Sequence, residues 1–365
     1  MHAIFSTKPV FRGLLWLLSC LIGSAYVAAA PFVPERNAQC VAVSLDGRFV
    51  ATGKSGMSNS EFPPRPHPTI RKCGLIQIWD ARTGRMLHRL QSFGDFTRLQ
   101  FSPDGKRLAS CRLFTPGEGL EMSEVRVWDV VTGKPLKVLN RCHAFAFHPQ
   151  GREFAVLSRS KCVVYDTRSF RKLRRIDELG RALSVEYASD GSKLLGVKQM
   201  AGKFHILSCD AISGSLLCES QGLEKPFYRV AACPSRPLVA SGHESGAVVL
   251  WDVEALTPLR QLKSYDRGLA HPFFSPDGTM LAVGSQRNGD VEFWDLASGK
   301  RAHRYTFQRG TLRTYHPRSP KDQICPERDP SRFAFMPNGD AFVAGCFGGM
   351  IRTVSSGQEL RRFGY

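Results

Sequence analysis

The feature that most constrains this chain is a sequence unit of about 40 to 45 residues that recurs along it. Seven corners of the Ser-Pro-Asp-Gly type begin at Ser44, Ser102, His148, Ala188, Cys233, Ser275 and Met336. Each is followed by an alternating segment that ends in Trp-Asp or in a degraded version of it. The clear versions begin at Trp79, Trp128, Trp251 and Trp294, and the degraded ones at Tyr165, Cys209 and Arg352. Seven paired motifs predict one repeat architecture rather than several unrelated domains.

The residues of the unit predict strands joined by tight corners. Proline sets the backbone of the first corner position, aspartate accepts hydrogen bonds from the turn, and glycine adopts the positive φ that strains other residues. Between corners apolar and polar residues alternate, as in residues 125–128, Val-Arg-Val-Trp. This is the period of a β-strand. We expect each unit to be a four-stranded antiparallel sheet and the whole to be an all-β, seven-bladed β-propeller.

From about Ala38 to Phe363, these motifs resemble those of the WD40 repeat family. The resemblance implies a WD40-like propeller with four antiparallel strands per blade. It also implies structural roles for the repeat residues Trp79, Asp80, Trp128, Asp129, Tyr165, Asp166, Asp210, Trp251, Asp252, Trp294 and Asp295. Many members carry a histidine before the first strand that joins a network with the tryptophan, and no repeat here has one at that spacing. We therefore expect the tryptophans to act mainly as packing wedges. Separately, we expect His243 to lie on the surface, in the tight turn between the second and third strands of blade 5.

The register of the repeats predicts how the ring begins and ends. The first copy starts with its innermost strand, at about residues 39–44, and the last ends with an outer strand, at about residues 359–363. Family members commonly close the ring by an exchange of strands between the two ends. No such exchange is predicted here, although residues 32–37 are long enough for a short additional pairing.

The N-terminus has the order of a secretory signal peptide. Lys8 and Arg12 precede an apolar run, residues 13–27, that ends in three alanines. We expect residues 1–29 to be the signal peptide, 30–37 a short N-terminal segment, and 38–365 the propeller of an exported protein, periplasmic or secreted. One alternative is a lipoprotein acylated at Cys20, and another is a retained N-terminal membrane anchor. No later segment reaches the roughly 20 apolar residues of a membrane-spanning helix.

The chain is strongly basic, with 50 Lys+Arg against 32 Asp+Glu in 365 residues and a formal charge of +18. Such a charge favours acidic partners. Many of the cations fall on predicted outermost strands, where charge discourages pairing with another chain. They are Arg89, Lys137, Arg174, Arg175, Arg260, Arg304, Arg361 and Arg362. We expect no nucleic-acid partner, because no nucleic-acid-binding motif accompanies the charge and the protein is predicted to be exported.

Three long insertions interrupt the repeats, at residues 55–73, 112–123 and 306–331. In a WD40-type propeller all three belong to the face opposite the tight corners, over blades 7, 1 and 2, which makes that face the predicted binding surface. The candidate binding residues are Phe62, Arg65, His67, Tyr315, His316 and Arg318. Cys73 and Cys325 are a candidate disulfide in an oxidising compartment. The alternative is that these loops only decorate a tolerant surface.

No catalytic motif accompanies the repeats. The sequence has no His-Glu-x-x-His, no Gly-x-Ser-x-Gly, no nucleotide-binding loop and no Cys-x-x-Cys. We predict a monomeric, non-catalytic scaffold that binds a protein or peptide, acidic in character, without a cofactor or a metal. Two alternatives from other classes are a propeller hydrolase or lyase with an axial site, and adhesion to an anionic polymer or membrane surface.

Overall fold

The computed structural model describes residues 40–57, 73–93, 95–113, 123–264, 268–285, 290–305, 333–344 and 350–363. The chain divides into two compact units, Met1–Glu35 and Arg36–Tyr365. Every described residue belongs to the second unit, and that unit is built from strands and turns. No helix in these ranges is long and apolar enough to cross a membrane.

The strands form seven antiparallel sheets of four consecutive strands each, which we number as blades 1 to 7 in chain order. Blades 1 and 2 comprise β1 (Cys40–Val43), β2 (Phe49–Met57), β3 (Cys73–Asp80), β4 (Met86–Phe93), β5 (Asp95–Phe101), β6 (Arg107–Leu113), β7 (Glu124–Asp129) and β8 (Pro135–Asn140). Blades 3 and 4 comprise β9 (Cys142–Phe147), β10 (Glu153–Ser158), β11 (Cys162–Asp166), β12 (Lys172–Ile176), β13 (Ser184–Tyr187), β14 (Lys193–Met200), β15 (Lys203–Asp210) and β16 (Leu216–Glu219).

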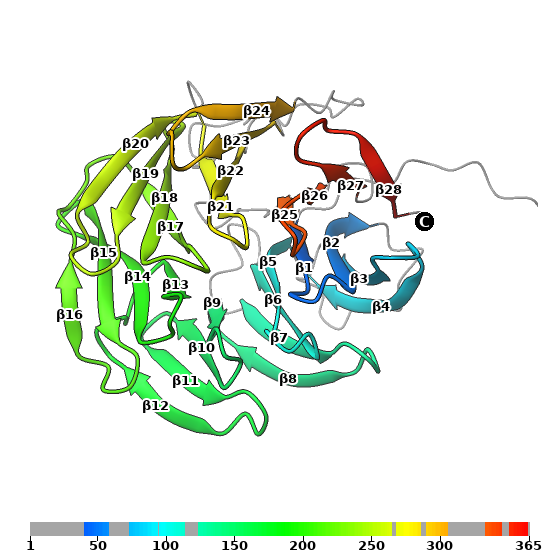
Figure 1. The fold of residues 1–365 in the computed structure, drawn as a ribbon. Coiled ribbons are helices and arrows are strands. Elements are labelled where there is room, and N and C mark those ends of the chain that lie inside the picture. Colours follow the sequence, from blue (N-terminus) through cyan, green and yellow to red (C-terminus); the bar gives the residue numbers. More distant parts are fainter. Residues whose placement is uncertain are drawn as a thin grey trace, which may run out of the picture. The chain divides into compact units, whose positions relative to one another are not determined.

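The remaining three blades repeat this order and complete a ring. They comprise β17 (Phe227–Ala232), β18 (Leu238–His243), β19 (Ala247–Asp252), β20 (Pro258–Lys263), β21 (Ala270–Phe274), β22 (Met280–Ser285), β23 (Val291–Asp295), β24 (Arg301–Tyr305), β25 (Phe333–Phe335), β26 (Ala341–Ala344), β27 (Met350–Thr353) and β28 (Glu359–Arg362). The first strand of each blade is innermost and the fourth outermost (Figure 1), and β25 contacts β1. The predicted seven-bladed propeller is confirmed.

The core is divided into seven apolar clusters, one between each pair of neighbouring blades. The alternation of side chains along a strand explains this division. In β11, Val163 and Tyr165 point into the cluster shared with blade 2, whereas Val164 points into the cluster shared with blade 4. Each strand therefore stabilises two interfaces, and each blade depends on both of its neighbours.

Blade 7 meets blade 1 through packing. The cluster between them includes Val41 and Trp79 of blade 1 with Val343 and Phe363 of blade 7. The Trp79 and Phe363 rings have centroids 5.7 Å apart. Within the described part of the chain each of these two sheets consists of its own four consecutive strands, so no strand exchange closes the ring there. Residues 32–37 lie outside the described residues.

Local hydrogen bonds stabilise the Trp-Asp corners. In blade 1 the Thr83 amide and hydroxyl both donate to Asp80 Oδ1, at 2.6 and 2.7 Å. These bonds hold the pKa of Asp80 below its usual range. Asp129, Asp166, Asp210, Asp252 and Asp295 accept from their own corners in the same way. The aspartate of the repeat therefore stabilises the turn between the third and fourth strands.

Side chains on several outer strands reach across to the corner of the next blade. His88 Nε2 lies 2.8 Å from the carbonyl oxygen of Val131, and Arg174 Nε donates to that of Ala211 at 2.6 Å. Cys218 and Arg260 make the equivalent contacts with Ala255 and Leu296, both at 3.3 Å. All four stand opposite the residue that precedes the repeat tryptophan or its replacement. We call His88, Arg174, Cys218 and Arg260 the bridging residues.

Bridging residues and the corners they cover are complementary in size. A Cβ added to corner Gly133 would lie 2.7 Å from His88 Nδ1, and one added to Gly299 would lie 2.3 Å from Arg260 Nη1. Where the bridging residue is the small Cys218, the corner position is instead Leu256, with φ 49°. Corner glycines therefore provide room for the neighbouring blade as well as a positive φ.

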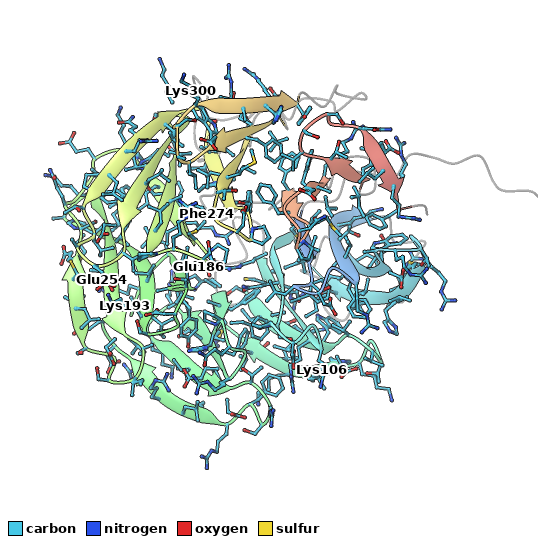
Figure 2. All side chains as sticks on the ribbon, viewed as in Figure 1. Lys106, Glu186, Lys193, Glu254, Phe274 and Lys300 are labelled. Atoms are coloured by element: carbon cyan, nitrogen blue, oxygen red, sulfur yellow. The ribbon has the colours of Figure 1, made fainter. Side chains whose placement is uncertain are left out.

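Several outer-strand cations, which the sequence suggested protect strand edges, have partners within the propeller. Arg174 pairs with Glu153, Arg304 Nη2 lies 3.0 Å from Asp290 Oδ2, and Arg362 Nη2 lies 2.9 Å from Glu359 Oε2. Between blades 4 and 5, Lys193 pairs with Glu254 (Figure 2). Part of the high positive charge is thus compensated locally.

Candidate functional site

The described residues enclose a cavity of about 540 Å³ on the propeller axis. All seven innermost strands contribute to its wall. Toward the tight corners its lining is largely apolar and includes Leu45, Pro103, Pro149, Pro234 and Pro276. The volume is within the range of small-ligand sites. This cavity is the concave site at which a propeller enzyme would place its catalytic groups.

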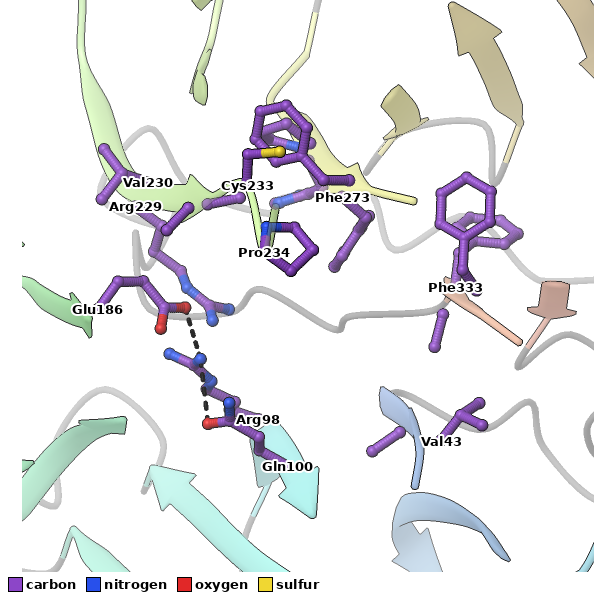
Figure 3. A pocket seen from close by; sticks show the side chains of 18 of the residues that line it. Val43, Arg98, Gln100, Glu186, Arg229, Val230, Cys233, Pro234, Phe273 and Phe333 are labelled. Atoms are coloured by element: carbon purple, nitrogen blue, oxygen red, sulfur yellow. Dashed lines mark hydrogen bonds and ion pairs between the residues drawn. The ribbon is translucent and has the colours of Figure 1, made fainter. Parts of the chain in front are cut away.

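An ion pair crosses the axial cavity between blades 2 and 4 (Figure 3). Arg98 Nη2, on β5, lies 2.5 Å from Glu186 Oε1, on β13. Both side chains are largely buried, with exposures of 12% and 16%. Arg98 Nη2 also donates to Gln100 Oε1 at 3.3 Å, and its guanidinium lies over the Phe145 ring. The pair therefore ties the inner strands of two non-neighbouring blades together.

A second guanidinium, Arg229 on β17, approaches this pair in Figure 3. Burial lowers the pKa of Arg98, the Glu186 carboxylate opposes that shift, and the charge of Arg229 adds to it. Beside it, the Tyr228 hydroxyl donates to Glu244 Oε1 at 2.8 Å, and burial together with this carboxylate raises the pKa of Tyr228. The guanidiniums of Arg98 and Arg229 and the carboxylate of Glu186 all line the wall of this cavity.

The described part of the chain buries several residues of types that can act in catalysis. It contains no group of three or more histidine, cysteine, aspartate or glutamate side chains placed to hold a metal. Ser241 Oγ lies 2.9 Å from His243 Nε2, but the two residues are 0% and 3% exposed. Burial raises the pKa values of Cys142 and Cys209 to about 11 and of Cys162 to about 12, which keeps these thiols protonated at neutral pH.

The tryptophans do more than the packing that the sequence suggested. Trp79 Nε1 donates to Thr52 Oγ1 at 3.0 Å, and Trp128 Nε1 donates to Ser110 Oγ at 3.1 Å. In blade 6 the equivalent second-strand residue is Val283, and Trp294 Nε1 has no hydrogen-bond partner among the described residues. The acceptor is therefore a hydroxyl on the second strand of the blade, opposite the residue two positions before the tryptophan. Where the sequence has a serine or threonine at this position, its hydroxyl accepts the hydrogen bond of the indole N–H.

The expectation that His243 lies in a surface turn is wrong. His243 is the last residue of β18 and the first residue of the turn that follows, with Gly246 N donating to its carbonyl, but its side chain is buried, with 3% exposure. In blade 5 Trp251 Nε1 donates to Ser241 Oγ at 2.8 Å, and Ser241 in turn contacts His243. Burial lowers the pKa of His243 to about 4. A histidine thus joins a tryptophan network here, from the end of the second strand.

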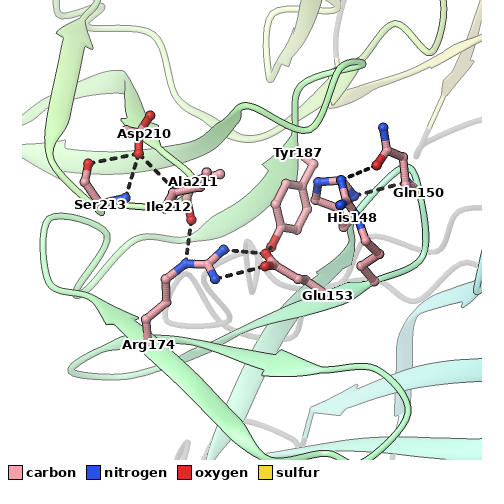
Figure 4. A network of polar contacts seen from close by, with 10 residues as sticks. His148, Gln150, Glu153, Arg174, Tyr187, Asp210, Ala211, Ile212 and Ser213 are labelled. Carbon is pink, nitrogen blue, oxygen red and sulfur yellow. Dashed lines mark hydrogen bonds and ion pairs between the residues drawn. The ribbon is translucent and has the colours of Figure 1, made fainter.

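A polar network joins blades 3 and 4 (Figure 4). Arg174 Nη1 donates to Glu153 Oε1 at 2.9 Å, and the Tyr187 hydroxyl lies 3.4 Å from Glu153 Oε2. Tyr187 also packs edge-on against His148, whose pKa is lowered by burial. Because Arg174 donates to Ala211 as well, this network links a bridging contact to the interior of blade 3.

The predicted binding residues are not placed by the structure. Phe62, Arg65, His67, Tyr315, His316, Arg318 and Cys325 lie outside the described residues. Cys73 opens β3, and its side chain is not described. Segment 58–72 joins β2 to β3, and segment 306–332 joins β24 to β25. The axial residues Arg98, Glu186 and Arg229 were missed by the sequence reasoning, although each is a charged residue inside a predicted innermost strand.

Comparisons with known proteins support the assignment of the repeats. No protein-family model matches the chain. The solved structure of the Myceliophteria thermophila Cps50 (Swd1) β-propeller domain superimposes with a TM-score of 0.64 at 14% identity, covering 89% of this chain and 100% of that one. This chain has the WD40-type propeller fold.

Curated sequences that match it are also WD40-type repeat proteins. Telomerase Cajal body protein 1 of Mus musculus is 29% identical over 131 residues, 35% of this chain and 25% of that protein. Autophagy-related protein 18 of Schizosaccharomyces pombe is 36% identical over 78 residues, 21% of this chain and 20% of that protein. The propeller chain spans about a quarter of the length of the first of these relatives.

Proposed function

We propose that this propeller is an exported, non-catalytic scaffold that binds a protein or peptide partner. The binding face is the one carrying segments 58–72, 114–122 and 306–332, over blades 7, 1 and 2. The observation that supports this proposal is that the connections at the two ends of the strands differ in length. Connections between first and second strands, and between third and fourth strands, are short and closed by their own hydrogen bonds, whereas these three segments all leave from the opposite ends.

The tight-corner face supports the proposal by being occupied with its own contacts. Ser44 Oγ donates to Asp46 Oδ1 at 2.6 Å, and Ser102 and Ser275 make the same bond to Asp104 and Asp277. The four bridging residues then tie the corners of blades 2, 4, 5 and 6 to the preceding blade. Because these polar groups already have partners, the tight-corner face has a structural role. The long connections on the other face can vary without loss of stability.

Export is proposed from the sequence of residues 1–29, whose basic, apolar and small-residue segments follow the order of a signal peptide. An exported scaffold would act in the cell envelope or outside the cell. Its partner would then be an envelope, secreted or surface protein. Mass spectrometry of the mature N-terminus from the native source tests this: a first residue at or near Ala30 is expected, and an intact Met1 or an acylated Cys20 contradicts it.

Affinity capture tests the binding role. The tagged mature protein is compared with a variant in which residues 58–72 are replaced by Asn-Gly, a two-residue link that keeps β2 and β3 paired as a hairpin. A matched control replaces Val131 and Ile212, exposed residues at tight corners, by serine. One salt-tolerant partner that is captured by wild type and control and lost from the deletion supports the proposal. Equal capture by all three proteins contradicts the proposed face.

A further inference from the structure

A second concave site lies between blades 2 and 3, away from the axial cavity. It is a cleft of about 1070 Å³, bounded by β8 of blade 2, by the strands of blade 3 and by the link from blade 3 to blade 4. Six of its lining residues are cationic, and none carries a carboxylate. The cations are Lys137, Arg141, Arg159, Lys161, Lys172 and Arg181.

These six cations differ from several cations elsewhere in the propeller that have carboxylate partners. Arg98, Arg174 and Arg304 each pair with a carboxylate. None of the six lining the cleft forms an ion pair within the part of the chain that the structure describes. All six are exposed or half-buried. A cleft with six positive charges and no compensating carboxylate attracts anionic groups.

The backbone holds two of these arginines in a conformation that favours glycine. Arg141 has φ 60° and Arg181 has φ 65°. A left-handed conformation strains an L-residue with a Cβ, so glycine would adopt it more easily at both positions. Arg141 N donates to the carbonyl of Ser123 at 2.7 Å, and Ala182 N donates to that of Leu179. The conformation is therefore fixed by the chain on either side, and strain of this kind concentrates at binding sites.

The interface that holds the cleft also lacks the bridging contact found at its neighbours. Lys137 stands opposite Val127, the position that His88, Arg174, Cys218 and Arg260 occupy in other blades. It makes no described hydrogen bond to the corner of blade 3, and it lines the cleft instead. The matching corner position is Phe170 rather than glycine. Leu139 and Phe170 pack against the apolar cluster shared by the two blades, and Leu139 also lines the cleft.

We infer that this cleft binds an acidic peptide segment that carries an apolar anchor residue. Carboxylates of such a segment meet the six cations, and the anchor packs on Val156, Val163 and Tyr165, buried residues that also line the cleft. A flat anionic surface would reach the outer cations but not this apolar lining, so the shape favours a peptide. The inference rests on the proposed scaffold function and adds a second site and a partner chemistry to it.

Peptide binding tests the inference directly. The probe is a fluorescein-labelled peptide of alternating glutamate and valine, and its counterpart replaces each glutamate by lysine. The variant Arg141→Gly with Arg181→Gly removes two cations and suits the positive φ, so its melting temperature should equal or exceed that of wild type. The control, Arg168→Ala with Arg171→Ala, removes two exposed cations of the same blade that do not line the cleft.

The expected result is weakening of about tenfold or more for the glycine variant and little change for the control, with no binding of the lysine peptide. Equal weakening in both variants, or unchanged binding in the glycine variant, overturns the inference. So does binding of phosphatidylglycerol vesicles through Arg141 and Arg181 without binding of the acidic peptide. The protein lacking residues 58–72 should still bind the peptide. The proposal for the binding face and the inference for the cleft can therefore be contradicted separately.

Discussion

Arg174 Nε, on the outer strand of blade 3, donates a 2.6 Å hydrogen bond to the carbonyl oxygen of Ala211, in a corner of blade 4. The same guanidinium donates to Glu153 at 2.9 Å through Nη1. One side chain therefore connects the second strand of its own blade to the next blade along the ring. Such contacts explain why corner and outer-strand residues must be considered together, across blades.

The first prediction concerns corner glycines. Gly133→Ala should destabilise the protein more than Gly202→Ala, although both positions have positive φ, 69° and 79°. Both substitutions incur the backbone cost of roughly 1–2 kcal/mol, but only at Gly133 does the new Cβ meet another blade, 2.7 Å from His88 Nδ1. Nothing lies within 4 Å of a Cβ at Gly202. Urea unfolding of the two variants measures the difference in the free energy of unfolding. Equal losses of free energy would show that contact with His88 does not require a glycine at position 133.

The second prediction concerns the tryptophan hydroxyls. Thr52→Val should cost about 1–3 kcal/mol, because it leaves Trp79 Nε1 buried without an acceptor. The reverse change, Val283→Thr, places a hydroxyl at the equivalent position beside Trp294 and should stabilise by about 1 kcal/mol. Denaturant unfolding with intrinsic fluorescence reports both. Unchanged stability in Thr52→Val together with no gain in Val283→Thr would mean that the indole hydrogen bonds contribute nothing beyond packing.

The third prediction is a pH dependence from His243. Its pKa is lowered to about 4 in the folded protein. In the unfolded chain the pKa of this residue is near 6.5. Between about pH 4 and pH 6.5 the unfolded chain therefore binds more protons than the folded chain. The contribution is fully present above pH 6.5, and about 3 kcal/mol of stability is lost as the pH falls to 4. Unfolding free energies measured from pH 4 to 7 should fall less steeply in His243→Gln; identical pH profiles would exclude His243 as the source.

The fourth prediction concerns the axial ion pair. Glu186→Leu should cost about 3 kcal/mol, because it leaves the Arg98 charge buried without its carboxylate partner and exposed to repulsion from Arg229. Adding Arg98→Met removes the uncompensated charge and should recover most of that loss. A double-mutant cycle from chemical denaturation measures the coupling. A double variant no more stable than Glu186→Leu alone would show that the two charges do not depend on each other.

The sequence was sufficient to predict the fold because its strongest signals are local. Corner residues such as Asp104 and Gly105 act within a few positions of each other, and seven copies fix the architecture together. The contacts between blades were not predictable in this way. His88 and Gly133, or Arg98 and Glu186, are far apart in the chain, and nothing in one repeat indicates which residue of another will face it.

The candidate sites show the same limit. Charged residues within innermost strands, such as Arg98 and Arg229, were a usable signal for the axial cavity. For the cleft between blades 2 and 3, the six cations come from five separate segments, and the left-handed backbone of Arg141 and Arg181 has no signature in residue type. His243 was misplaced on the surface because a position beside a turn does not indicate that the side chain is buried and contacts Ser241.

The most direct measurement for the scaffold account is amine cross-linking of the captured partner, followed by mass spectrometry. The two faces of the propeller carry different lysines. Lys72 and Lys321 belong to the long segments, whereas Lys106, Lys134 and Lys300 follow tight corners. The account predicts partner cross-links at Lys72 and Lys321 and none at the corner lysines. Cross-links concentrated at Lys106, Lys134 and Lys300 would contradict it.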